Sequence, residues 1–394
     1  MRRDSRNKEF QQTLLPMPAI ESSALIRVIG VGGGGSNAVD RMIEEGIGGV
    51  EFIAMNTDGQ ALMRSRANNR LRLGDRTTRG LGAGGDPKIG EKAGEESIDE
   101  MASLLEGSDM VFITAGMGGG TGTGATPLVA EVARDLGALT IGVVTKPFSF
   151  EAAHRSRAAE DGIERLKKYV DTLIVIPNDK LLEMADRRIT LVDSFRMADD
   201  VLRQGIQGIS ELITIPGLIN LDFADVKTIM SLGGAALMAV GHGTGEDKAI
   251  VAAEQALSSR LLDISIDGAR GVLFNITGGP DLGLVEINQA ASIIRETADP
   301  DVNLIFGAVI DEAMDDKVRL TAIATGFERT RPQISPFTSH RVDRRLPSGR
   351  PVRESEPVAA EASNESRPVA RASQRPVVRI NDLDVPTFLR KRSG

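Results

Sequence analysis

The feature that most constrains the fold is a run of five glycines and two threonines at residues 118–124, Gly-Gly-Gly-Thr-Gly-Thr-Gly. It follows an apolar run at 110–114 and precedes a helix-like stretch at 125–136. Glycines let the backbone adopt positive φ and approach a ligand, and the N–H groups of the loop and of the first helical turn face the same space. The two threonines add hydroxyl donors without bulk. The pattern predicts a strand, an anion-binding loop and a helix, in preference to a flexible glycine hinge.

A second glycine-rich loop lies near the start of the chain. A strand-like run at 24–31 leads into four glycines at 32–35, after which Ser36 and Asn37 open a helical pattern. Because strands and helices then alternate, we expect a parallel sheet with helices on both faces. Ligands of such sheets bind at the carboxyl ends of the strands, where both glycine loops fall. The further strands are expected at 51–55, 110–114, 139–144 and 172–176, with helices at 88–105, 125–136 and 151–169.

The pattern changes in the second half of the chain. Apolar residues recur at helical spacing over 191–213 and predict one long central helix. Beyond it, shorter helices and strands alternate as far as about residue 327, which indicates a second, smaller α+β domain. The helices are expected at 223–231, 246–259 and 284–296, and the strands at 235–240, 271–276, 302–310 and 318–325.

Composition and charge exclude several classes of function. The chain has no cysteine and only three histidines, without close spacing, which excludes disulfides, thiolate metal sites and a zinc pattern. Residues 331–394 hold 13 Lys and Arg against 7 Asp and Glu, so the remaining residues carry −14 within a total of −8. An acidic body is a poor non-specific binder of nucleic acid, and we expect no specific nucleic-acid partner. No apolar run approaches a membrane span, so we expect a cytoplasmic protein without direct membrane insertion.

Two common nucleotide-binding motifs fit poorly. Residues 85–92 lack the Gly-Lys-Ser/Thr of a P-loop, and residues 145–148 lack the aspartate with which P-loop GTPases bind guanine. The dehydrogenase fingerprint fits the loop at 30–35, with Glu51 as a weak match for its ribose-binding acid. A dehydrogenase fold does not explain residues 118–124, so a dehydrogenase is the least favoured of the three functions that we consider.

The combination of these loops resembles the FtsZ family of bacterial tubulin-like cell-division GTPases, over roughly residues 24–328 and at the extreme C-terminus. Residues 118–124 match the tubulin signature of that family and 32–37 its first phosphate loop. Residues 56–58 match the second loop, and 82–85 the loop that senses the γ-phosphate. The resemblance implies GTP or GDP as the bound nucleotide. It implies no metal site formed by protein side chains, with Mg²⁺ held through the nucleotide phosphates.

The same resemblance implies individual contacts. Glu151 and Arg155 should contact the ribose and a neighbouring phosphate, with Asn178, Phe195 and Asp199 around guanine. Amide and carboxylate groups pair with the edge of guanine and a Phe ring stacks on its face, although asparagine is common in the family where Asp199 stands. Phe195 as a helix core residue, and Glu151 with Arg155 as a surface pair, stay open as alternatives. The phosphate-binding residues implied are Gly33, Gly34, Gly35, Ser36, Asn37, Asp58, Ala83, Gly84, Gly85, Gly118, Gly119, Gly120, Thr121, Gly122 and Thr123.

Hydrolysis of GTP needs an oriented water molecule, and the glycine loops carry no obvious group for it. Asn220, Asp222 and Asp225 lie at the start of a predicted helix, where first-turn acids could also serve only the helix dipole. The resemblance assigns them as catalytic residues in a loop that enters the nucleotide site of the next subunit. We therefore expect a head-to-tail homopolymer, a GTPase active on assembly. The alternative is a nucleotide-binding structural or regulatory tubulin-like protein without significant turnover.

The C-terminal residues 380–394 differ from the preceding segment by their apolar content. Val385, Phe388 and Leu389 would share one face of a short helix, which on a disordered tether is typical of a docking peptide; a frayed basic end is the alternative. The resemblance implies division adaptor or membrane-tethering proteins as partners, at the mid-cell division site. The expected order is a flexible extension (1–23), GTP-binding domain (24–190), central helix (191–213), C-terminal activation domain (214–329), disordered linker (330–379) and docking peptide (380–394).

Overall fold

The computed structural model describes residues 24–185, 189–215, 217, 219, 221–258, 269–298 and 301–327. The predicted N-terminal extension at 1–23, the linker at 330–379 and the docking peptide at 380–394 lie outside the described residues, as does Asn220. The predictions made for these parts of the chain stay predictions.

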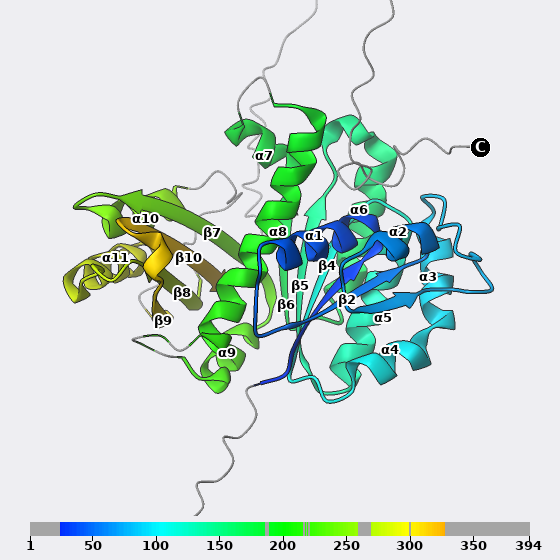
Figure 1. The fold of residues 1–394 in the computed structure, drawn as a ribbon, viewed down its shortest axis with the longest axis horizontal. Coiled ribbons are helices and arrows are strands. Elements are labelled where there is room, and N and C mark those ends of the chain that lie inside the picture. Colours follow the sequence, from blue (N-terminus) through cyan, green and yellow to red (C-terminus); the bar gives the residue numbers. More distant parts are fainter. Residues whose placement is uncertain are drawn as a thin grey trace, which may run out of the picture. The chain divides into compact units, whose positions relative to one another are not determined.

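One ten-stranded sheet runs through the described residues, in the order β3-β2-β1-β4-β5-β6-β7-β10-β8-β9 (Figure 1). The strands from β3 to β7 pair in parallel, β10 is antiparallel to both β7 and β8, and β9 is parallel to β8. An α/β fold with a mainly parallel sheet and a smaller mixed part is therefore confirmed. The strands are β1 (Ile26–Val31), β2 (Glu51–Asn56), β3 (Asn69–Arg72), β4 (Met110–Gly116), β5 (Leu139–Lys146), β6 (Thr172–Pro177), β7 (Gly234–Thr244), β8 (Gly271–Gly278), β9 (Asn303–Ile310) and β10 (Lys317–Thr325).

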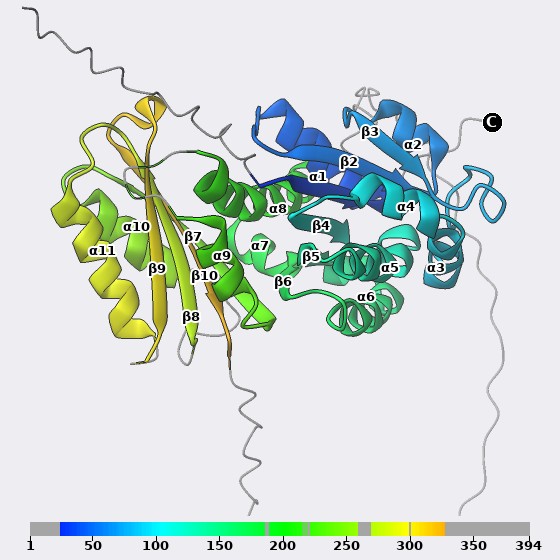
Figure 2. The same ribbon diagram turned by 90° about the horizontal axis from the view of Figure 1, so that it is seen from below.

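Helices cover both faces of the parallel part of the sheet (Figure 2). Successive strand residues point to opposite faces, so Val28 of β1 packs with one helix layer and Ile29 with the other. The first layer contains α1 (Gly32–Glu44) and α8 (Leu191–Thr214). The second contains α3 (Pro87–Glu96), α4 (Ile98–Leu105), α5 (Thr121–Asp135) and α6 (Ala153–Leu166).

The long helix α8 agrees with the predicted central helix to within one residue at its end. Its 24 residues make it about 36 Å long at the usual rise per residue. The Thr190 hydroxyl accepts a hydrogen bond from the Asp193 N–H at 3.1 Å and caps the helix start. Near the other end, Arg319 of β10 donates to Glu211 at 2.7 Å. The helix therefore packs in the core of the parallel part of the sheet and is bonded to β10 near its C-terminal end.

The part of the sheet formed by β7, β10, β8 and β9 has its own core. Buried side chains of α10 (Lys248–Leu257) and α11 (Leu284–Thr297) pack on Phe274, Ile276 and Leu320 of these strands. The helix α9 (Phe223–Met230) instead contributes Val226, Ile229 and Met230 to the core beside α8. Because β6 and β7 pair within the same sheet, the sheet is continuous across the segment where the domains were predicted to meet. The predicted domain boundaries at 190 and 214 therefore stay predictions.

Several local predictions differ from the structure. The helix predicted at 88–105 is two helices, separated at Ser97, whose hydroxyl accepts a hydrogen bond from Gly74 N–H at 3.1 Å. The helix predicted at 151–169 is a 3₁₀ turn, η1 (Ser149–Glu151), followed by α6. The elements that were not predicted are short: α2 (Gly59–Arg64), β3, α7 (Asn178–Met184) and the 3₁₀ turn η2 (Glu312–Met314). Over the described residues, no helix has the length and apolar character to cross a membrane.

Candidate functional site

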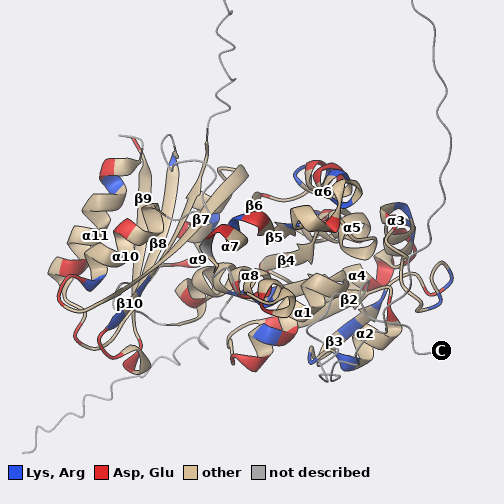
Figure 3. Cartoon of the chain, turned by 90° about the horizontal axis from the view of Figure 1, so that it is seen from above, with Lys and Arg blue, Asp and Glu red and all other residues tan. Residues whose placement is uncertain are grey.

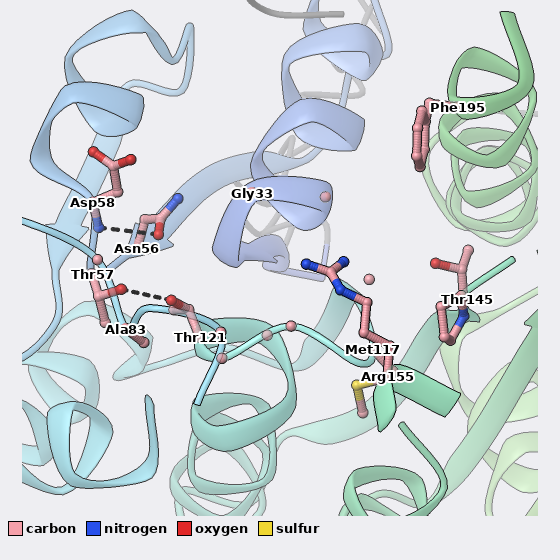
Figure 4. Close-up of a pocket in the computed structure, with 18 of the residues that line it drawn as sticks. Gly33, Asn56, Thr57, Asp58, Ala83, Met117, Thr121, Thr145, Arg155 and Phe195 are labelled. Carbon is pink, nitrogen blue, oxygen red and sulfur yellow. Dashed lines mark hydrogen bonds between the residues drawn. The ribbon is translucent and has the colours of Figure 1, made fainter. Parts of the chain in front are cut away.

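A cavity of about 830 Å³ lies at the carboxyl edge of the parallel strands (Figure 4). The chain lines it directly after five of these strands: at Gly33 after β1, Thr57 after β2, Met117 after β4, Pro147 after β5 and Asn178 after β6. The first turns of α8 complete the wall with Phe195, Ala198, Asp199 and Leu202. The cavity therefore occupies the edge where the sequence predicts a ligand site.

Glycines form the middle and one end of the cavity. A Cβ atom at Gly84, Gly85 or Gly119 would meet no heavy atom within 4 Å, so the backbone faces open space there. Gly84 and Gly85 also have φ of 62° and 83°, which only glycine adopts without strain. The α5 helix begins at Thr121, next to the cavity, so the N–H groups of its first turn add donors for an anion. This wall fits a chain of phosphate groups.

Five residues of the predicted phosphate-binding set do not line the cavity: Gly35, Ser36, Asn37, Gly118 and Thr123. A Cβ atom at Gly35 would lie 2.3 Å from the Thr114 carbonyl oxygen, so this glycine lets α1 pack against β4. Gly118 has φ of 93°, and its N–H donates to the Thr123 hydroxyl at 2.8 Å. Gly35, Gly118 and Thr123 therefore support the packing of the glycine loops, while Ser36 and Asn37 lie within α1. The predicted phosphate-binding residues that do line the cavity are Gly33, Gly34, Asp58, Ala83, Gly84, Gly85, Gly119, Gly120, Thr121 and Gly122.

The opposite end of the cavity suits a planar heterocycle. Asn178 is 5% exposed, and within the described part of the chain its Oδ1 has no hydrogen-bond partner. A buried acceptor without a partner costs stability unless a ligand donates to it. The Phe195 ring lines the cavity and packs edge-on against buried Phe148, with ring centroids 5.5 Å apart. Asp199 accepts from Arg41 Nε at 3.2 Å. The structure thus brings the three residues implied for guanine together.

Glu151 and Arg155 lie in the cavity wall between the two ends. Their side chains form an ion pair at 2.9 Å and are only 6% and 21% exposed, so they are not a surface pair. Glu151 also accepts from the Phe148 N–H at 3.0 Å. Ala152, directly between η1 and α6, has φ of 80° and ψ of 152°, a region that alanine rarely adopts. The pair is therefore held by a strained backbone.

A carboxylate behind the cavity anchors one of its loops. Glu96 of α3 accepts hydrogen bonds from Arg76 N–H at 2.7 Å, from Thr77 N–H at 3.1 Å and from the Thr77 hydroxyl at 2.8 Å. These hydrogen bonds lower the pKa of Glu96 to about 2, and the bond from the Arg76 backbone makes the largest contribution. The anchored segment continues into residues 80–85, which line the cavity.

The predicted catalytic acids lie elsewhere. Asp222 caps α9, accepting from the Asp225 N–H at 2.8 Å, and its side chain is exposed. The other end of α9 meets the first residue of β6, because the Thr172 hydroxyl donates to the Met230 carbonyl. Asn178 follows the last residue of β6 and lines the cavity, so α9 lies at the opposite edge of the sheet (Figure 1). The structure does not bring Asp222 and Asp225 to the cavity of their own chain.

Several lining residues were not among the predicted contacts. Asn56, Thr57 and Gly82 lie in loops that the sequence singled out. Met117 directly follows β4 and Thr145 is next to the last residue of β5, positions that would have predicted them. The Thr57 and Thr121 hydroxyls are 2.6 Å apart. Gln60 and Arg64 gave no signal because α2 itself was not predicted. Among the residues that the structure describes, no group of three or more His, Asp or Glu is arranged to hold a metal ion.

Comparisons with known proteins agree with this geometry. A model of the GTPase domain of the Tubulin/FtsZ family matches residues 25–186, and a model of the C-terminal domain of the FtsZ family matches residues 234–328. A mutant FtsZ from M. jannaschii is 47% identical, over 77% of this chain and 92% of that one, with a TM-score of 0.75. An empty FtsZ dimer from M. jannaschii is 46% identical, over 78% and 89%, with a TM-score of 0.75.

A more distant structure shares the fold alone. The GDP-bound monomer of CetZ1 from Haloferax volcanii is 20% identical, over 77% of this chain and 95% of that one, with a TM-score of 0.67. The resemblance that the glycine loops suggest is thus confirmed by two family models and by structures close to half identical over most of the chain. The chain belongs to the Tubulin/FtsZ family of GTPases.

Proposed function

We propose that this protein hydrolyses GTP at the interface between two of its own copies and assembles head-to-tail into filaments. The observation that carries the proposal is the separation within one chain: the cavity lies at the carboxyl edge of the sheet, and Asp222 and Asp225 lie at the amino edge. A second copy, stacked in the same orientation, would place its α9 over the cavity of the first. Such a heterologous contact repeats without closing and gives a filament.

The carboxylates inside the cavity support the need for a second copy. Asp58 caps α2 by accepting from the Gln60 N–H at 2.9 Å. Glu151 is paired with Arg155, and Asp199 with Arg41. Each already accepts hydrogen bonds that fix the loops of the cavity, whereas orienting the attacking water needs a carboxylate or amide directed at the terminal phosphate. Asp222, which is exposed, and Asp225, which is half-buried, would meet that need from another copy.

The same proposal covers the cellular role. GTP strengthens the contact between copies, and its hydrolysis to GDP weakens it, so the filaments turn over. Such filaments would organise the division ring at mid-cell in the cytoplasm, with adaptor or membrane-tethering proteins bound through residues 380–394. Mg²⁺ would reach the site on the nucleotide phosphates and balance their charge.

The test replaces each acid by its amide. Asp222 is the N-cap of α9, where Asn serves as well as Asp, so Asp222→Asn removes a carboxylate and leaves the helix intact. Asp225 lies in the first turn, and its side chain is not the cap, so Asp225→Asn also keeps the capping bond. We expect GTP affinity to stay unchanged and turnover to fall by about 10² to 10⁴ fold, the range for a lost general base or positioning group. Asp99→Asn, in the first turn of α4, is the matched control and should keep full turnover.

Two outcomes would separate this proposal from its alternatives. Turnover per molecule that stays constant as the wild-type protein is diluted would contradict a site shared between copies. Wild-type protein that binds GTP and releases no phosphate at any concentration would support a structural or regulatory role instead. Light scattering, followed with phosphate release after addition of GTP, measures assembly and turnover together.

A further inference from the structure

The two ends of the cavity give the bound nucleotide a direction. Figure 4 shows Phe195 on one side and Asp58 on the other, with Gly33 and Thr121 between them. A base stacked at Phe195 and phosphates along the glycines would place the terminal phosphate towards the α2 end. That end is lined by Asp58, Gln60, Arg64 and residues 80–85.

The charges that line the cavity do not suit a triphosphate as they stand. Among the described lining residues, the acids are Asp58, Glu151 and Asp199, and the bases are Arg64 and Arg155. The sum is negative, and a nucleoside triphosphate adds several more negative charges, so cations are needed beside the phosphates. Arg155 forms its ion pair with Glu151, in the wall between the two ends of the cavity. Arg64 is the cation of the α2 end.

The position of Arg64 follows from the geometry of α2. It is the last residue of that helix, and its Nε donates to the Gln60 carbonyl at 3.3 Å, one turn earlier. The side chain of Arg64 therefore folds back along the helix to the Gln60 backbone, and Arg64, Gln60 and Asp58 all line the cavity. The neighbouring strand β3 carries two more arginines, Arg70 and Arg72 (Figure 3), but of these three arginines Arg64 is the lining residue.

We propose that Arg64 contacts the terminal phosphate of the bound nucleoside triphosphate, so that the protein distinguishes GTP from GDP through this side chain. A guanidinium presents five N–H donors in a planar fork that matches phosphate oxygens, and it keeps its charge at any physiological pH. GDP ends one phosphate earlier and does not reach the α2 end of the cavity. The inference rests on the proposed function, since it requires GTP in this cavity.

The experiment compares two nearby arginines. Arg64→Gln removes the charge and keeps a long polar side chain, Arg64→Lys keeps the charge and loses the fork, and Arg66→Gln is the control. Arg66 lies two residues further along, is 53% exposed and pairs with Glu44 at 2.8 Å, away from the cavity. Dissociation constants for GTP and for GDP are measured with Mg²⁺ present, on protein dilute enough to stay unassembled.

We expect Arg64→Gln to raise the dissociation constant for GTP by about tenfold, the size of one charge-assisted hydrogen bond. The dissociation constant for GDP should rise by less than about twofold. Arg64→Lys should weaken GTP less, and Arg66→Gln should leave both constants unchanged. Equal weakening of GTP and GDP by Arg64→Gln would overturn the proposal, as would unchanged affinity for both. In the second case a loss of assembly alone would assign Arg64 to the contact between copies.

The two proposals fail in different ways. Wild-type protein that binds neither nucleotide would overturn the function of the cavity itself. Wild-type protein that binds GTP normally, with an Arg64→Gln variant that keeps the same preference for GTP over GDP, would overturn the role of Arg64 alone. Circular dichroism of each variant confirms that the compared proteins are folded.

Discussion

Replacing Ala152 by glycine should stabilise the protein, which is unusual for a change of alanine to glycine. Ala152 is exposed, so glycine removes no buried methyl group. Its φ of 80° with ψ of 152° lies in a region that is essentially restricted to glycine and costs other residues about 1 to 3 kcal/mol. Glycine relieves that strain but loses about 0.5 to 1 kcal/mol through the entropy of the unfolded chain. The net expectation is a gain of about 0 to 2.5 kcal/mol in the free energy of unfolding, centred near about 1 kcal/mol.

The assay is urea unfolding followed by circular dichroism, with the same substitution in the middle of α6 as the control. Ala158 lies in that helix, where Ala158→Gly should destabilise the protein by about 1 kcal/mol. The two variants should therefore shift the urea midpoint in opposite directions. A loss of stability in Ala152→Gly equal to that in Ala158→Gly would show that residue 152 carries no strain, and the reasoning about the Glu151 and Arg155 wall would fail with it.

Three further predictions concern other parts of the chain. Gly35→Ala should fail to fold or lose more than about 3 kcal/mol of unfolding free energy, because its Cβ would lie 2.3 Å from the Thr114 oxygen. Gly119→Ala should fold and weaken nucleotide binding. Thermal unfolding and a binding titration distinguish the two variants. The lowered pKa of Glu96, about 2, means that this carboxylate stabilises the fold above its unfolded pKa of about 4.3 and loses that contribution as pH falls towards 2. Glu96→Gln should accordingly flatten the fall in unfolding free energy between those pH values. Deleting residues 380–394 should abolish binding to a division adaptor and leave GTP turnover unchanged, as measured by pull-down and phosphate release.

The order of the elements could be predicted because strand and helix patterns alternate clearly. The start points of the helices could not, since α1 and α5 begin inside glycine runs that have low helix propensity. Tertiary packing overrides propensity there: a Cβ atom at Gly124 would lie 2.1 Å from the Pro87 oxygen, so only glycine lets α5 approach α3. Arg64 was missed for a related reason, because α2 is too short to show a period.

The position of the predicted catalytic acids relative to the cavity could not be predicted from residue spacing either. Nothing in the sequence fixes the distance between the glycine loops and Asp222, and the separation becomes clear only when Thr172 and Asn178 mark the two ends of β6. Six residues of strand span about 20 Å, which separates the cavity from the Met230 end of α9. A resemblance can therefore name the acids, but the proposal that they act on another copy depends on their position relative to the sheet.

The signature at residues 118–124 serves folding and binding with different members of the same run. Gly119, Gly120 and Gly122 line the cavity, while Gly118 and Thr123 hold the loop together by a hydrogen bond and Gly124 packs α5 against α3. A Cβ atom at Gly120 or Gly122 would also clash, at 2.8 Å in each case, so substitution there damages the fold and the site together. Gly119 alone in this run has open space at its Cβ position. It is consequently the position within the signature where loss of nucleotide binding can be separated from loss of folding.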